Sequence, residues 1–127
     1  MVAVLRDYFR HGDSYEVESI EYCDDALNAL SQQRFDLMLL LSVFARWRTR
    51  PRAVRFSGLE LLKRMRALDI QVPVLVISAS TLAQAKREAL TNGAFVFILQ
   101  PINLDELGRL VARALGANRP ADDSTVA

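Results

Sequence analysis

Two uninterrupted apolar runs of strand length constrain this chain more than any other feature. They are DLMLLLSV at residues 36–43 and PVLVIS at residues 73–78. Continuous apolar runs are typical of parallel strands that are covered on both faces, whereas strands with one solvated face alternate apolar and polar residues. A sheet of this kind needs helices on both sides, so the two runs predict an α/β domain.

The rest of the chain shows hydrophobic patterns that are typical of helices or of strands. Further strands are predicted at residues 15–20 and 95–99. Helices are predicted at residues 24–32, from Ser57 onward, after Thr81, and from Asn103 to about Leu115. From residue 15 the order is therefore β-α-β-loop-α-β-α-β-α, which predicts a doubly wound parallel sheet. In such sheets the functional residues lie where the strands end.

Local signals mark several helix ends. Capping boxes are predicted at three helix starts, namely Ser57 with Glu60, Thr81 with Gln84, and Asn103 with Glu106. The pair Asn92-Gly93 predicts a left-handed helix end, because glycine has no Cβ to oppose that conformation.

Length and composition predict one domain. The chain has 127 residues, of which 51% are hydrophobic and 24% charged, which is ordinary for a globular protein. Its longest apolar run, residues 37–41, is far shorter than a membrane span, and the N-terminus has no signal pattern. The single cysteine, Cys23, fits a reducing compartment. We therefore expect a cytoplasmic domain over residues 1–116, with a small, polar and disordered tail at residues 117–127.

Four segments together resemble the receiver domain of bacterial response regulators. They are YEVESIEYCDDALNAL, FDLMLLL, SGLELLKRMRALDIQVPVLVISAS and EALTNGAFVFILQPINLDEL, and the resemblance extends from residue 4 to residue 115. It implies a flavodoxin-like fold with strand order 2-1-3-4-5. It also implies a role in two-component (phosphorelay) signalling without enzyme activity. The implied partner is a histidine kinase or another regulator, with a homodimer as a further possibility and no membrane partner.

The resemblance assigns roles to five positions. An active receiver has a phospho-accepting aspartate after its third strand and a lysine after its fifth, but these positions are Leu41 and Gln100 here. The Ser/Thr, aromatic and proline positions are retained as Ser78, Phe97 and Pro101. Leucine has no nucleophilic atom, and glutamine carries no charge. We therefore expect a stand-alone, degenerate receiver with no phosphorylation, no catalytic residue and no Mg²⁺ or other metal site.

The start of the chain allows two interpretations. In the favoured one, VLRDYFRHGDSYEV contains the first helix, so the first strand and its Mg²⁺-binding acids are missing. In the other, residues 2–5 are the first strand and Arg6-Asp7 stand where the acids would be. That second interpretation leaves only residues 8–14 for the crossover, which is short for parallel strands. Either way at least one acid is missing, and rearranged strand pairing is one means of filling the gap in the sheet.

The loop after the third strand is about nine residues longer than in the family, and it is basic. It contains one tryptophan and five arginines without an acid, and we treat it as a candidate interaction loop made of Arg46, Trp47, Arg48, Arg50, Arg52 and Arg55. Such a loop can meet an acidic protein, stack on and grip nucleic acid, or stay solvated without a specific role. Nucleic acid is the weakest of these interpretations, because no basic helix stands beside the loop. A receiver that uses a different acid, Asp7 or Asp36, is a further alternative.

Overall fold

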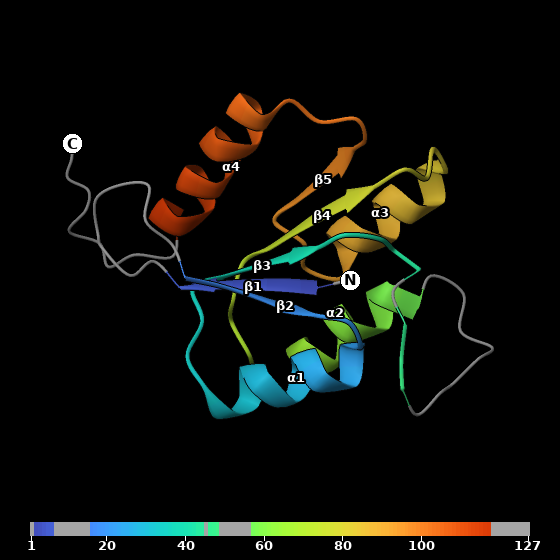
Figure 1. Cartoon of the computed structure of the whole chain (residues 1–127). Coiled ribbons are helices and arrows are strands. Elements are labelled where there is room, and N and C mark those ends of the chain that lie inside the picture. Colours follow the sequence, from blue (N-terminus) through green and yellow to red (C-terminus); the bar gives the residue numbers. More distant parts are fainter. Residues whose placement is uncertain (1, 7–15, 45, 49–56, 118–127) are drawn as a thin grey trace.

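The computed structural model describes residues 2–6, 16–44, 46–48 and 57–117. Within these residues five strands form one sheet and four helices cover it (Figure 1). The strands are β1 (Val2–Arg6), β2 (Glu16–Ile20), β3 (Leu37–Leu40), β4 (Val74–Ser78) and β5 (Val96–Leu99). The helices are α1 (Cys23–Gln32), α2 (Ser57–Ala67), α3 (Ala83–Thr91) and α4 (Leu104–Ala117).

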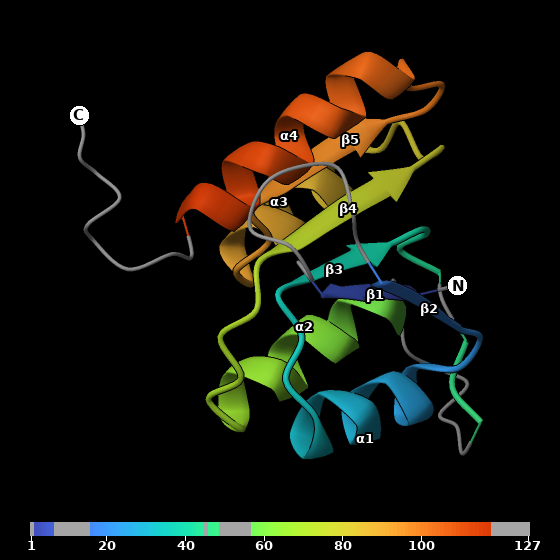
Figure 2. The ribbon, with the colours of Figure 1, turned by 60° about the vertical axis from the view of Figure 1, so that its left-hand side comes forward.

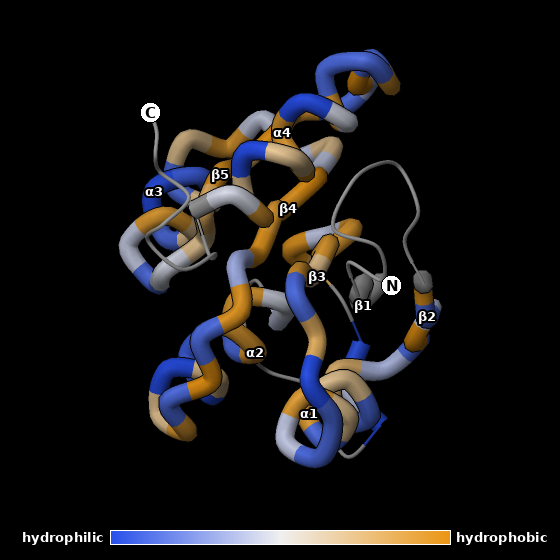
Figure 3. Tube along the Cα trace, turned by 90° about the vertical axis from the view of Figure 1, so that its left-hand side faces the viewer, coloured by the Kyte–Doolittle hydropathy of each residue, from blue (hydrophilic) through white to orange (hydrophobic). Residues whose placement is uncertain are grey.

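The sheet has the order β2-β1-β3-β4-β5, which is the strand order implied by the resemblance. The pairs β3–β4 and β4–β5 are parallel, as the continuous apolar runs predicted. Every residue of β4 is buried. Figure 3 shows hydrophobic colour concentrated along the central strands, while hydrophilic and hydrophobic segments alternate along the helices.

The β1 strand departs from the expected topology. It lies in the centre of the sheet but runs antiparallel to both neighbours, with Val2 level with Ile20 on β2 and with Leu40 on β3. The favoured helical interpretation of this segment is therefore wrong. The strand interpretation is right about the element, but it is wrong in placing Arg6 beside the acid positions, and Asp7 lies outside the described residues. Arg6 pairs with Glu16 at the opposite edge. An antiparallel pair needs only a short connection, so the brevity of residues 7–15 agrees with this direction.

Helices cover both faces of the sheet (Figure 2). On one face α1, α2 and α3 bury a core that includes Ala26, Met38, Leu61 and Ala89. On the other face α4 packs over Leu37 and Leu75 through its own apolar side, Val111, Ala114 and Leu115. Within the described residues, none of the helices is long and apolar enough to cross a bilayer.

Of the four predicted helix-end signals, two are confirmed and two are wrong. Ser57 is the first residue of α2, so it is not the residue before the helix that a cap requires. Asn103 Oδ1 accepts the backbone N–H groups of Asp105 at 2.7 Å and Glu106 at 3.2 Å, as a capping residue does. Gly93 ends α3 with φ of 102°. Thr81, however, does not cap α3, because that helix begins one residue later than a cap at Thr81 requires and its N-cap is Leu82. The last helix extends to Ala117, and the rest of the expected tail lies outside the described residues.

A residue after α2 has left-handed backbone. Asp69 has φ of 59°, a region in which a Cβ costs about 1–2 kcal/mol and glycine pays nothing. We therefore expect Asp69→Gly to be more stable than Asp69→Ala by about 1 kcal/mol in urea unfolding. Both variants remove the hydrogen bond that Asp69 accepts from Gln71, so the comparison isolates the backbone effect. Equal stability of the two would show that the left-handed geometry is absent in solution.

Candidate functional site

The carboxyl ends of β3, β4 and β5 lie at one edge of the sheet, which we call the carboxyl edge. The register sets Leu40 level with Val76 and Ser78 level with Leu99. Leu41, which follows β3, is therefore at the height of Ile77, one residue before Ser78. Gln100 follows β5 and donates its backbone N–H to the Ser78 carbonyl oxygen at 2.9 Å. The structure thus brings Leu41, Ser78 and Gln100 to the same edge, as the sequence predicted.

The retained positions are locally well defined. Ser78 is 2% exposed, and its Oγ accepts the backbone N–H of Ser80 at 3.0 Å. Phe97 is partly buried and packs against the core formed with α1, α2 and α3. The peptide bond between Gln100 and Pro101 is cis, as the resemblance implied for this proline. These contacts define the local structure where β4 and β5 end.

The residues at the carboxyl edge do not fit a Mg²⁺ ion. Mg²⁺ requires oxygen ligands and is usually bound through one or two carboxylates. The described loop residues that follow β3, β4 and β5 (residues 41–44, 46–48, 79–82 and 100–103) include no Asp or Glu, and Glu21, which follows β2 at this edge, is paired with Arg46. The reversed β1 directs its carboxyl end to the other edge, because Arg6 lies level with Glu16. Within the described part of the chain, no group of three or more His, Cys, Asp or Glu side chains could hold a metal.

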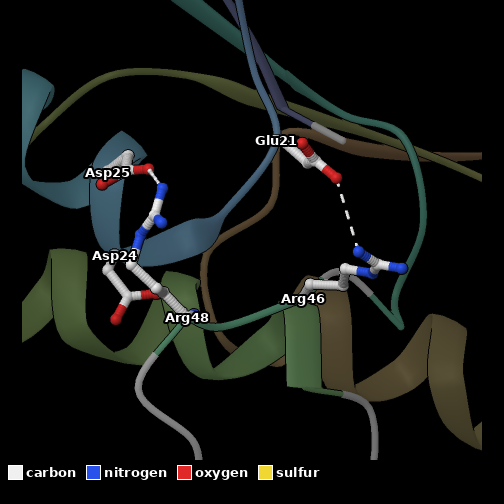
Figure 4. A network of polar contacts seen from close by, with 5 residues as sticks. All are labelled: Glu21, Asp24, Asp25, Arg46 and Arg48. Carbon is white, nitrogen blue, oxygen red and sulfur yellow. Dashed lines mark hydrogen bonds and ion pairs between the residues drawn. The ribbon is translucent and has the colours of Figure 1, made fainter.

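The first part of the arginine-rich loop is bound to the start of α1 (Figure 4). Arg48 Nη2 lies 2.7 Å from Asp25 Oδ2, and the Arg48 backbone N–H donates to Asp24 Oδ1 at 2.6 Å. Arg46 Nη1 lies 3.4 Å from Glu21 Oε2. The hydrogen bond to Asp25 raises the pKa of the Arg48 guanidinium above its usual value. These two arginines of the predicted interaction loop therefore already have carboxylate partners within the protein.

Trp47 anchors the same segment. Its Nε1–H donates to the Ser57 carbonyl oxygen at 2.9 Å, and its ring packs against the core below α1 and α2. The Arg64 guanidinium lies 5.0 Å from the ring centroid, close enough for a cation–π contact. With Leu27 and Arg64, Trp47 lines a shallow groove of about 280 Å³ between the two helices. The tryptophan thus holds the loop in place, while Arg50, Arg52 and Arg55 lie outside the described residues.

The cysteine has no reactive character. Cys23 is the first residue of α1 and its side chain is fully buried. Burial raises its pKa from 9.0 to about 12, so the thiol stays protonated at neutral pH. Because the thiolate is the nucleophilic form, Cys23 contributes packing rather than chemistry.

Two features of the site were missed from the sequence. Gly58 approaches the residues that follow β3, and a Cβ built on it would lie 2.7 Å from the Ser42 carbonyl oxygen. The signal was present in the SGLELL motif, but it was interpreted only as a helix start. The contacts of Glu21, Asp24 and Asp25 with the loop were also missed. Three acids followed about twenty residues later by arginines carry no periodicity, so pairing between them could not be inferred.

Comparison with known proteins identifies the family. Residues 1–112 match the family model of the response regulator receiver domain. The chain is 28% identical over 116 residues to the transcriptional regulatory protein ZraR of Escherichia coli K12, covering 91% of this chain and 24% of ZraR. It is 31% identical over 105 residues to the response regulator protein PilR of Pseudomonas aeruginosa, covering 83% of this chain and 22% of PilR. The chain thus spans about a quarter of the length of these relatives.

A solved structure shows the same fold. The receiver domain of the Francisella response regulator 1452 superimposes with a TM-score of 0.61 at 22% identity, covering 77% of this chain and 74% of that one. The fold, the edge geometry and the sequence match agree with one another. This chain belongs to the response regulator receiver domain family.

Proposed function

We propose that this receiver domain acts in two-component signalling through protein–protein contact and without accepting a phosphoryl group. The observation that carries the proposal is the chemistry of two strand ends, where Leu41 follows β3 and Gln100 follows β5. The partner that best fits a domain of this family is a histidine kinase or another regulator. A domain that does not receive a phosphoryl group must be regulated by its abundance, by a bound partner or by another ligand.

The chemistry of phosphoryl acceptance supports this proposal. A receiver needs a nucleophilic carboxylate, and it needs positive charge to offset the transferred phosphoryl group. Leu41 supplies no nucleophile, and Gln100 supplies no fixed charge. Ser78 keeps a hydroxyl at the edge, but this hydroxyl has no acid or lysine beside it in the loops that follow β3, β4 and β5. The edge can therefore offer neutral hydrogen bonds, and it lacks the groups that bind and transfer phosphate.

Asp36, one of the two alternative acids, does not reach this edge. It immediately precedes β3, so it lies at the opposite edge of the sheet, and its Oδ1 is 3.9 Å from Arg34 Nε. A phosphoryl group on Asp36 would be remote from Ser78 and Gln100. Asp7, the other acid, lies outside the described residues.

We expect the protein to remain unmodified when it is incubated with acetyl phosphate and Mg²⁺. Intact-mass measurement at neutral pH should show only the unmodified chain, and beryllofluoride with Mg²⁺ should leave the tryptophan fluorescence unchanged. A stoichiometric, acid-labile adduct would refute the proposal. If such an adduct formed, its loss in Asp36→Asn would identify Asp36 as the acceptor, and its persistence would point elsewhere.

Nucleic-acid or acidic-partner binding through the arginine-rich loop is not the function we favour. Arg46 and Arg48 are paired with Glu21 and Asp25, and Trp47 is partly buried. A stacking platform for bases needs an exposed ring. The described part of the loop therefore makes contacts within the protein, and it lends this alternative no support.

A further inference from the structure

The first turn of α1 is capped by a segment that is distant in the sequence. The first N–H groups of a helix have no partner within the helix, and the N-cap residue Tyr22 makes no side-chain capping hydrogen bond. The Cys23 N–H donates instead to the Arg46 carbonyl oxygen at 2.8 Å. Tyr22 and Arg46 also form a parallel β-bridge. The loop after β3 therefore completes the start of α1.

The first turn of α2 contacts the same segment. The Gly58 N–H donates to the Val43 carbonyl oxygen at 2.7 Å, and the Trp47 Nε1–H donates to the Ser57 carbonyl oxygen at 2.9 Å. Val43 is fully buried, and Trp47 packs against the core. We name this segment the strap, and it consists of the described residues 43–44 and 46–48. The strap thus contacts the first turns of two helices that are separated by β3 in the chain.

Arg48 holds the α1 end of the strap (Figure 4). Its backbone N–H donates to Asp24 Oδ1 at 2.6 Å, and its Nη2 lies 2.7 Å from Asp25 Oδ2. Its guanidinium lies 4.4 Å from the centroid of the Tyr22 ring. The side chains of the ion pair are about half exposed, 58% for Arg48 and 48% for Asp25. Exposed ion pairs contribute little to stability, so this end of the strap can open while the core stays folded.

Trp47 connects the two ends of the strap. Its ring lines the groove between the helices together with Leu27 of α1 and Arg64 of α2, and the Arg64 guanidinium lies 5.0 Å from the ring centroid. Because Arg48 is the next residue in the chain, its release from α1 also displaces Trp47. We propose that the strap is a conformational clasp that couples α1 and α2, so that its contacts with the two helices open and close together.

The clasp connects the carboxyl edge to both helices. The strap begins directly after Leu41 and Ser42, the residues that follow β3. A partner that moves the end of β3 therefore moves Val43 and, through the strap, the first turns of α1 and α2. Coupling between two sites is reciprocal, so a disturbance at either end of the strap must affect the other. The clasp goes beyond the proposed function, and it does not depend on whether the edge accepts a phosphoryl group.

Residue-resolved amide hydrogen exchange measured by NMR tests the proposal, because each end of the strap has its own reporter. The Cys23 N–H reports on the α1 end, and the Gly58 N–H reports on the α2 end. The Val76 amide lies in the fully buried strand β4 and reports on global unfolding. Exchange rates of the two reporters are therefore expressed relative to the rate at Val76.

Arg48→Ala disturbs the strap from the α1 end. It removes the side-chain contacts with Asp25 and Tyr22, both of which lie at that end. Exchange at both reporters is expected to rise by the same factor, about threefold to tenfold relative to the amide in β4. Arg113→Ala is the matched control, because Arg113 is an exposed residue of α4. It removes the same charge away from the strap, and both relative rates should stay at their wild-type values.

Trp47→Phe disturbs the strap from the α2 end. It removes the hydrogen bond to Ser57 and keeps an aromatic ring, and exchange should rise at Cys23 as well as at Gly58. The proposal is overturned if either variant raises exchange only at its own end, because the two ends would then open independently. A general loss of stability leaves both relative rates unchanged, and that result also counts against the clasp. An acetyl phosphate adduct would refute the proposed function and would leave this measurement unaffected.

Discussion

Replacement of Gly58 by alanine is expected to destabilise the domain by about 2 kcal/mol. A Cβ at this position would lie 2.7 Å from the Ser42 carbonyl oxygen and 3.1 Å from the Val43 carbonyl carbon and oxygen. All three are backbone atoms, so no side-chain rotation can relieve the contact. The Gly58 N–H also donates to the Val43 carbonyl oxygen at 2.7 Å, which fixes α2 against the residues that follow β3. Urea unfolding should show a lower midpoint with an unchanged slope.

Gly108→Ala is the matched control for this variant. Gly108 lies inside α4 with no atom within 4 Å of the position that its Cβ would occupy. Alanine is favoured over glycine inside a helix by about 0.5–1 kcal/mol, so this variant should be stabilised. The prediction for Gly58 fails if both variants are stabilised, because that result would place α2 farther from the residues after β3.

Gly58 also shows what sequence reasoning could and could not establish. The SGLELL motif located the start of α2, and the apolar runs located β3 and β4. The close approach of α2 to Ser42 was invisible, because it depends on the distance between two segments and not on periodicity. For the same reason Thr81 was wrongly assigned as the cap of α3. Spacing alone does not determine which residue a helix begins at.

The candidate site was predictable to a different degree. Strand order and parallel pairing follow from the alternation of strands and helices, so placing Leu41, Ser78 and Gln100 at one edge required only the order of elements. The direction of β1 was not predictable in this way, because the sequence of residues 2–5 is compatible with a parallel strand and with an antiparallel one. Its short connection to β2 was the only clue, and it was used as evidence against a strand. The clue excluded a parallel strand, and the antiparallel alternative was not considered.

Proline at Val4 should unfold the domain or destabilise it by about 3 kcal/mol or more. Val4 is in the middle of β1, level with Glu18 on β2 and with Met38 on β3. A strand with neighbours on both sides uses its N–H groups in one ladder or the other, so proline removes a hydrogen bond and leaves a carbonyl group of the neighbouring strand unpaired. Val4→Thr keeps the N–H and the β-branched shape, and it should be much less harmful.

The direction of β1 can be tested separately, with cysteine pairs in a Cys23→Ala background. The antiparallel register sets Val2 level with Ile20, whereas a parallel strand would bring Arg6 to that level. Oxidation should therefore link Val2→Cys to Ile20→Cys and leave the pair Arg6→Cys and Ile20→Cys unlinked, because a disulfide tolerates only short Cα separations. The reverse pattern would show a parallel β1, and Arg6-Asp7 would then lie at the carboxyl edge. Since that edge would regain an acid, this one measurement also decides whether the lack of Mg²⁺ binding that we propose follows from the strand arrangement.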